Sequence, residues 1–370
     1  MAIEQTARAA RARPWQRPPV VGGALIAATV AGLLAYGASS GGFSCITGMG
    51  AWSQLVISGL TLGVIYAMIA LGYTMVYGVL QLLNFAHSEI FMIGSFAGLY
   101  AIQSLFGVTT ANHPNGIGGS YLILVVLVAL LLGGVASGAV AVGMERVAYR
   151  PLRRRGTSRL GYLITAIGMS LFLQNLFLLM DGGTHLGFHW PNIAGAGPVS
   201  YPNAMNPSTA FTVLGTPVTN QQALSVVVAV IMLIVLDLFV RRTRAGKGMR
   251  AVAEDPETAA LMGVNIDRVV ALTFFVGGLM AGVAGVLYGM QFNAQFNMGF
   301  VPGIKAFTAA VLGGIGNVRG AMLGGVLLGL IENLGAGCLG TQWQEVIAFI
   351  VLVVVLMFRP TGLLGEQVGG

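Results

Sequence analysis

The stretch YLILVVLVALLLGGVASGAVAVG, residues 121–143, contains no charged side chain, and the basic segment MERVAYRPLRRR, residues 144–155, follows it directly. A helix needs about 20 predominantly apolar residues to cross the hydrocarbon core of a bilayer. Basic residues collect in the loops on the cytoplasmic side of such helices. This pair of segments therefore predicts a membrane-spanning helix that ends at the cytoplasmic surface.

Composition extends this prediction to the whole chain of 370 residues, because 56% of them are hydrophobic and only 8% are charged. Soluble domains carry about 25% charged residues, so a chain this poor in charge cannot cover a water-facing surface. The sequence therefore predicts an all-α polytopic membrane protein with about 9–10 transmembrane helices. Nine further apolar runs supply them: 20–37, 53–78, 89–107, 160–180, 222–240, 268–290, 304–316, 320–338 and 343–358.

The basic residues fix an expected orientation. Two basic clusters, at 146–159 and 241–250, fall on one side when every apolar run counts as a crossing, and Arg319 and Arg359 fall there too. The positive-inside pattern then places both termini in the cytoplasm and the 181–221 segment outside. These loops explain the net charge of +7. The sequence has no basic stripe with interleaved aromatic residues, which is the pattern that would indicate nucleic-acid binding.

Three organisational features of the sequence are less certain than the spans: its first 50 residues, one short run and a possible internal repeat. Residues 1–50 form a basic tail and an extra span at 20–37, which is either a retained anchor helix or a cleaved signal sequence. Run 304–316 is short and follows Pro302-Gly303, which predicts a broken or re-entrant helix. The stretches 59–98 and 277–314 are both Gly-rich with a polar interruption, and duplicated halves are common in transporters.

The loop from Arg241 to Arg268 carries clear signals for a short helix, roughly Pro256 to Met262. Asp255 can act as the N-cap, Pro256 suits the first helical position, and Gly263 fits a left-handed stop. This is either a solvated connecting helix or a docking helix for a cytoplasmic partner. In the docking case, the expected apolar contact surface consists of Ala259, Ala260 and Met262.

Polar residues within apolar runs are candidates for function, since charge at membrane depth is costly. Asn84 and Glu89 either form the start of a helix, as cap and first-turn acid, or line a pathway or gate together with His87. Lys305 is a further candidate for the pathway or gate, and it either extends to lipid headgroups or pairs with a carboxylate such as Glu89 or Glu332. The four histidines form no HExxH pattern, so we expect no metal site.

Several stretches resemble one family of membrane proteins. Glu257-Thr258-Ala259 followed by Gly263 is similar to the EAA-x3-G loop of ATP-binding-cassette importer permeases, with Thr258 in place of the first alanine. Residues from about 52 to 365 resemble the high-affinity branched-chain amino-acid permease family, the LivH type, although Ser88 stands where that family usually has glycine. The matching stretches are GVIYAMIALGYTMVYGVLQLLNFAHSEIFMIGSF (63–96), ERVAYRPLR (145–153), LITAIGMSLFLQN (163–175), MRAVAEDPETAALMGVNIDRVVALTF (249–274), GFVPGIKAFTAAVLGGIGNVRGAMLGG (299–325) and RPTGLLG (359–365).

The resemblance implies the permease subunit of an importer in the bacterial inner membrane, with a permease domain at 51–365 and the fold of the type II, vitamin-B12-importer-like permeases. It implies a second, sister permease, two cytoplasmic ATP-binding subunits that carry ATP and Mg²⁺, and an extracytoplasmic substrate-binding protein. This chain would then be no enzyme and would bind no cofactor. The residues implied to couple it to the ATPase, within the loop 241–268, are Glu254, Asp255, Pro256, Glu257, Ala259, Ala260 and Gly263.

Two other functions stay open. A urea or short-chain amide importer would have a nearly identical permease. An ion-coupled secondary transporter would need no ATPase. The sequence has no G-x4-G-K-[ST] pattern; Gly246-Lys247 comes nearest, with Gly248 after the lysine.

Overall fold

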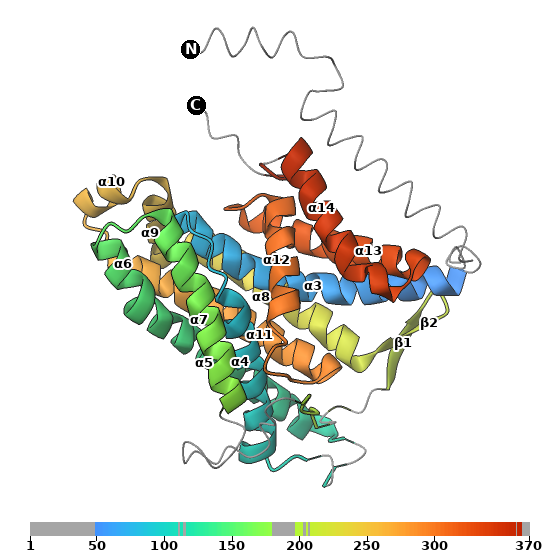
Figure 1. Cartoon of the computed structure of the whole chain (residues 1–370). Coiled ribbons are helices and arrows are strands. Elements are labelled where there is room, and N and C mark those ends of the chain that lie inside the picture. The colour runs from blue at the N-terminus through green and yellow to red at the C-terminus, as the bar shows by residue number, and fades with distance from the viewer. Residues whose placement is uncertain are drawn as a thin grey trace, which may run out of the picture.

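The computed structural model describes residues 49–109, 112–113, 116–179, 197–202, 205, 208–359 and 361–364. The regular elements in these ranges are helices and one short β-hairpin, joined by loops (Figure 1). The α-helices are α3 (Met49–Leu80), α4 (His87–Tyr100), α5 (Gly119–Met144), α6 (Arg150–Arg154), α7 (Arg159–Leu179), α8 (Asn220–Arg242), α9 (Arg244–Glu254), α10 (Pro256–Leu261), α11 (Ile266–Phe292), α12 (Phe300–Gly313), α13 (Val318–Leu339) and α14 (Gln344–Phe358). The remaining elements are the π-helices η3 (Ala101–Leu105) and η4 (Glu145–Tyr149), the 3-10 helix η6 (Thr341–Trp343), and the antiparallel strands β1 (Thr209–Val213) and β2 (Thr216–Thr219).

Within the described ranges, 7 helices are long and apolar enough to cross a membrane. They are Trp52–Leu80, Gly119–Arg154, Leu160–Leu178, Asn220–Arg242, Ile266–Phe292, Val318–Leu339 and Thr341–Phe358. The prediction of an all-α polytopic membrane protein is therefore confirmed. The expected span at 20–37 lies outside the described residues.

The two remaining predicted runs form shorter helices. Run 89–107 corresponds to α4 and its π-helical continuation η3, and run 304–316 corresponds to α12. The expected start of α12 after Pro302 was wrong, because the helix begins at Phe300 and includes the proline. Proline is tolerated there, since an N–H in the first helical turn has no partner within the helix.

The basic clusters gather at one end of the bundle, which we call the basic end: residues 150–154, residues 241–250 and Arg319. Asp237, near the end of α8, pairs with Arg241 at 2.8 Å and with Arg319 of α13 at 3.7 Å. In Figure 1, α6, α9 and α10 lie together at this end, far from the β1–β2 hairpin. The chain therefore alternates between two ends in the order that the sequence predicts.

The helices form an inverted repeat. In the first unit, α3 runs toward the basic end and is followed by α4 and α5; in the second, α11 starts at the basic end and is followed by α12 and α13. The packing repeats as well, because α3 lies against α13 as α11 lies against α5. Both α4 and α12 have 14 residues, although α4 continues directly into the 5 residues of η3. At 1.5 Å per residue, α12 alone is too short to span about 30 Å of hydrocarbon. The suggested similarity of 59–98 and 277–314 thus has a structural basis.

Glycine allows the helices α3 and α13 to touch along their backbones. A Cβ atom on Gly63 would lie 2.9 Å from Val326 Cα, and one on Gly329 would overlap the backbone of Gly63. Without a hydrophobic drive between helices in lipid, such close packing is a main source of helix association. This contact holds the two repeat units together.

We predict that Gly329→Ala lowers the thermal unfolding midpoint in detergent, because the added methyl group overlaps α3 and overpacking costs about 1–3 kcal/mol. Gly143→Ala in α5 is the matched control, since a Cβ added at this position would have nothing within 4 Å. The control should keep or raise the midpoint, because alanine favours helix over glycine by up to about 1 kcal/mol. Equal midpoints for the two variants would contradict the packing argument.

Candidate functional site

The short helix α10 protrudes at the basic end and is capped as predicted. The Asp255 carboxylate accepts a hydrogen bond from the Glu257 backbone N–H at 2.9 Å and another from the Thr258 hydroxyl. The Thr258 hydroxyl, with the backbone N–H groups, holds the pKa of Asp255 below its usual range. Pro256 occupies the first turn, and Gly263 has a φ of 82°, the left-handed conformation that ends a helix.

Exposure along α10 corrects the predicted contact surface. Ala259 is 4% exposed and faces back into the protein, so it cannot touch a partner. Ala260 is exposed as expected, together with Glu254, Asp255, Pro256 and Glu257. The most prominent apolar side chains are Leu261, 87% exposed, and Met262, 81% exposed. Sequence reasoning missed Leu261, because in so short a helix the outward face is set by packing against the rest of the protein.

An ionic network joins the segment after α10 to α5. Asp267, in the first turn of α11, pairs with Arg153 and, at 3.0 Å, with Arg154. Arg153 also reaches Glu145, at 3.3 Å, and Arg150 reaches the same carboxylate at 3.0 Å. Glu145 is fully buried. Neither Glu145 nor Asp267 was singled out from the sequence. The partners of Asp267 lie in a different loop, whereas those of Glu145 follow it within the same basic segment.

The starts of the two short helices meet inside the bundle. Cβ atoms on Gly299 and Gly303, around the first turn of α12, would overlap Ser88, which lies in the first turn of α4. Beside this contact Glu89 is fully buried and accepts hydrogen bonds from the Ser170 hydroxyl at 3.1 Å and the Ser88 hydroxyl at 3.4 Å. The helix starts and Glu89 thus form one polar centre.

A pocket of about 570 Å³ adjoins this polar centre. Its walls come from α3, α4, α7, α12 and the segments before α4 and α12. The lining residues are Tyr73, Phe85, Ser88, Ile167, Ser170, Leu171, Gln174, Asn297, Phe300, Val301 and Ile304. Both serines that bond Glu89 are therefore also part of the pocket wall.

Asn84 and His87 are buried but have other neighbours. The Asn84 Oδ1 accepts a hydrogen bond from the Tyr149 hydroxyl at 2.7 Å, while α4 has Ala86 at its N-cap position and no side-chain cap. The interpretation of Asn84 as a helix cap was therefore wrong, since its side chain is used to join the α3–α4 loop to η4. The His87 ring lies edge-on to Tyr73, with ring centroids 4.8 Å apart.

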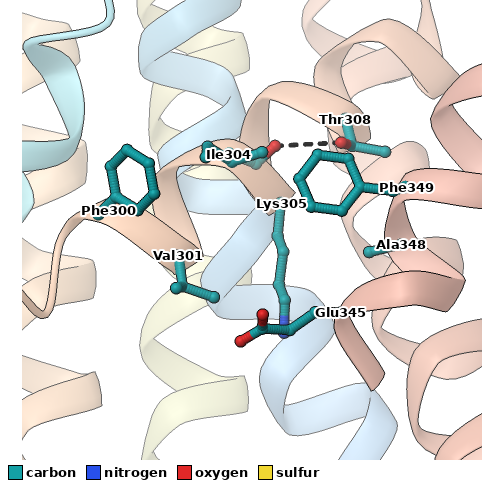
Figure 2. Close-up of a pocket in the computed structure, with 8 residues that line it drawn as sticks. All are labelled: Phe300, Val301, Ile304, Lys305, Thr308, Glu345, Ala348 and Phe349. Carbon is teal, nitrogen blue, oxygen red and sulfur yellow. Dashed lines mark hydrogen bonds between the residues drawn. The ribbon is translucent and has the colours of Figure 1, made fainter. Parts of the chain in front are cut away.

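Lys305 pairs with Glu332, one of the alternatives open from the sequence. The Nζ–Oε1 distance is 2.5 Å, and the Tyr66 hydroxyl donates to the same oxygen at 3.4 Å. Figure 2 shows Lys305 in a second pocket, between α12 and α14, with Glu345 at its lower edge. Lys305 and Glu89 thus belong to separate sites.

An inverted repeat of apolar helices, with two short helices that meet at a buried carboxylate, is typical of membrane transport proteins. The family described as branched-chain amino acid transport system, permease component, matches residues 55–356. The chain belongs to this family of permeases. No solved structure matches it.

Named relatives agree over most of the chain. The high-affinity branched-chain amino acid transport system permease protein BraD of Pseudomonas aeruginosa is 44% identical over 314 residues, which cover 85% of this chain and 95% of the relative. The corresponding LivH protein of Escherichia coli K12 is 42% identical over 317 residues, with the same coverage. A probable LivH permease of Methanocaldococcus jannaschii is 26% identical over 312 residues, covering 80% of this chain and 88% of the relative.

We predict that Lys305→Met strongly destabilises the protein, because it leaves Glu332 buried without its cation and breaking a buried pair costs about 3–5 kcal/mol. The double variant Lys305→Met/Glu332→Leu should recover most of the loss, since neither charge then remains. Unfolding midpoints of the wild type, both single variants and the double variant measure this coupling. Additive effects of the two substitutions would show that the pair contributes nothing.

Proposed function

We propose that this chain is the permease subunit of an ATP-driven importer of leucine, isoleucine and valine. The observation that carries the coupling to ATP is the exposed Leu261–Met262 pair at the tip of the capped helix α10. The substrate class rests on the family and on relatives that are permease proteins of branched-chain amino acid transport systems.

The basic end faces the cytoplasm in this proposal, since loops rich in arginine and lysine stay on that side. The tip of α10 then lies in water, where two large apolar side chains gain free energy by entering a partner's groove. We assign the partner as an ATP-binding subunit on the basis of the family, and because this sequence has no P-loop pattern, ATP would have to be bound by that other chain. Asp255 and Gly263 fix the two ends of α10, so the tip is presented in one geometry.

Force on α10 has a direct route into the membrane. The helix leads through a short turn into α11, and Asp267 ties that start to α6 through Arg153 and Arg154. Arg153 and Arg150 continue the tie to Glu145, at the end of α5. A displacement of the tip would therefore move the basic ends of α5 and α11 together.

The opposite end is suited to receive substrate from a binding protein. A pocket of about 410 Å³ lies there between α3, α8, α11, α13 and α14. Its polar lining includes Thr61, Gln222, Gln291, Asn333 and Gln344. The complete importer would pair this chain with a sister permease and two ATP-binding subunits in the cytoplasmic membrane of a bacterium.

We predict that Leu261→Asp abolishes copurification of the ATP-binding subunits and reduces leucine uptake at least tenfold, because it places a charge in the apolar contact. Ala260→Glu should act in the same direction. Leu214→Asp is the matched control, since Leu214 is 74% exposed in the hairpin at the opposite end. Retention of the ATP-binding subunits by Leu261→Asp would contradict the docking role.

We predict that proteoliposomes with the complete transporter and a loaded binding protein take up leucine only when ATP is supplied to the ATP-binding side. A protonophore should leave uptake unchanged, and urea should not be taken up in the same vesicles. Uptake that collapses with the protonophore while ATP remains would identify an ion-coupled transporter and overturn the proposal.

A further inference from the structure

Three carboxylates are fully buried among the described residues: Glu89, Glu145 and Glu332. Two of them have a fixed cation, since Glu145 pairs with Arg150 and Arg153 while Glu332 pairs with Lys305. In the described part of the chain, no ion pair includes Glu89, and its Oε2 has no hydrogen-bond partner. A buried charge without a cation is costly, so a position that keeps one is a candidate binding site.

The surroundings of Glu89 favour negative charge without supplying a cation. Glu89 lies in the first turn of α4, and a Cβ on Gly299, the N-cap residue of α12, would lie 3.2 Å from its Oε2. Helix N-termini carry partial positive charge from unpaired N–H groups, and both helices direct that charge toward this carboxylate. Glu89 is therefore held ready to accept a cation from outside the chain.

The adjoining pocket has the mixed character of a small-ligand site. Its volume of about 570 Å³ lies within the usual range for such sites, about 300–1,000 Å³. Apolar walls come from Ile167 and Leu171 of α7 and from Val301 and Ile304 of α12. The Ser170 and Ser88 hydroxyls donate hydrogen bonds to Glu89, and both residues line the pocket, so they link the carboxylate to the pocket wall.

We propose that this pocket binds the amino acid in transit, with Glu89 receiving the α-ammonium group and the apolar walls receiving the branched side chain. The substrate then supplies the cation that Glu145 and Glu332 obtain from the chain itself. This inference rests on the proposed function, because it names the binding site of that same importer. It also gives the transmembrane pathway a selectivity of its own, for an ammonium group beside an apolar side chain.

The test uses a cysteine at Gln174, which lines the pocket on α7 one helical turn beyond Ser170. The complete transporter in membranes carries Gln174→Cys and is treated with a cationic or an anionic methanethiosulfonate reagent. The cationic reagent should react several-fold faster, and Glu89→Gln should bring the ratio of the two rates close to one. The parent chain without the added cysteine gives the background labelling.

Two further variants distinguish a local electrostatic effect of the Glu89 carboxylate from a change in the fold. Ser170→Ala removes a hydroxyl but keeps the carboxylate, so the preference for the cationic reagent should remain. Asn333→Cys reports on the separate pocket at the opposite end, where Glu89→Gln should leave the ratio unchanged. Equal rates for both reagents at Gln174→Cys, or a cationic preference that survives Glu89→Gln, would overturn the inference.

Uptake distinguishes failure of the site from failure of the proposed function. In the parent transporter, leucine uptake with ATP is expected, and Glu89→Gln should reduce it at least tenfold while the ATP-binding subunits still copurify. Glu89→Asp should recover part of the uptake, since it keeps the charge. Normal uptake in Glu89→Gln would overturn the site alone, whereas no leucine uptake in the parent would overturn the importer assignment itself.

Discussion

The starts of α4 and α12 lie inside the bundle, and the first N–H groups of a helix have no partner within that helix. Lipid cannot supply one, so such ends persist at membrane depth only where protein surrounds them. Gly299 and Gly303 meet this requirement by allowing α12 to press against Ser88. The start of α4 is buried, and the start of α12 is buried where it meets Ser88, although Phe300 is 57% exposed. The rest of the fold depends on supplying both helix starts with this protein surface.

The buried charges follow from this enclosure. Lys305 of α12 and Glu332 of α13 form an ion pair that fixes the short helix α12 to the next helix of its own repeat unit. Glu145 gathers two arginines where α5 reaches the basic end, which fixes the position of the α5–α6 turn. Glu89, the third of the fully buried carboxylates among the described residues, lies beside the starts of α4 and α12. A buried ion pair fixes where two helices meet more than it adds to stability. Glu145 and Glu332 are used in this way, whereas the carboxylate of Glu89 remains available to a ligand.

Local signals in the sequence were sufficient for α10, because Asp255, Pro256 and Gly263 act on neighbouring backbone and need no tertiary information. For Lys305 the sequence left open extension to lipid headgroups or pairing with a carboxylate such as Glu89 or Glu332, since that choice depends on how α12 packs against α13. Asn84 was misassigned for the same reason, as its partner Tyr149 lies in another segment. The apolar runs predicted the membrane spans well. The pocket beside Glu89 could not be predicted from the sequence, because its walls come from α3, α4, α7 and α12, which are distant in the chain.

One helix connects the two functional regions. The first turn of α11 holds Asp267 of the ionic network. Farther along, α11 packs so closely on α4 that a Cβ on Gly285 would overlap the backbone of Phe91, and a Cβ on Gly94 of α4 would overlap the backbone of Gly282. Close-packed backbones cannot slide independently, so a shift at the start of α11 must be shared by α4. Because Glu89 stands at the start of α4, movement of the α10 tip and exposure of the buried carboxylate would be parts of one rearrangement in the proposed importer.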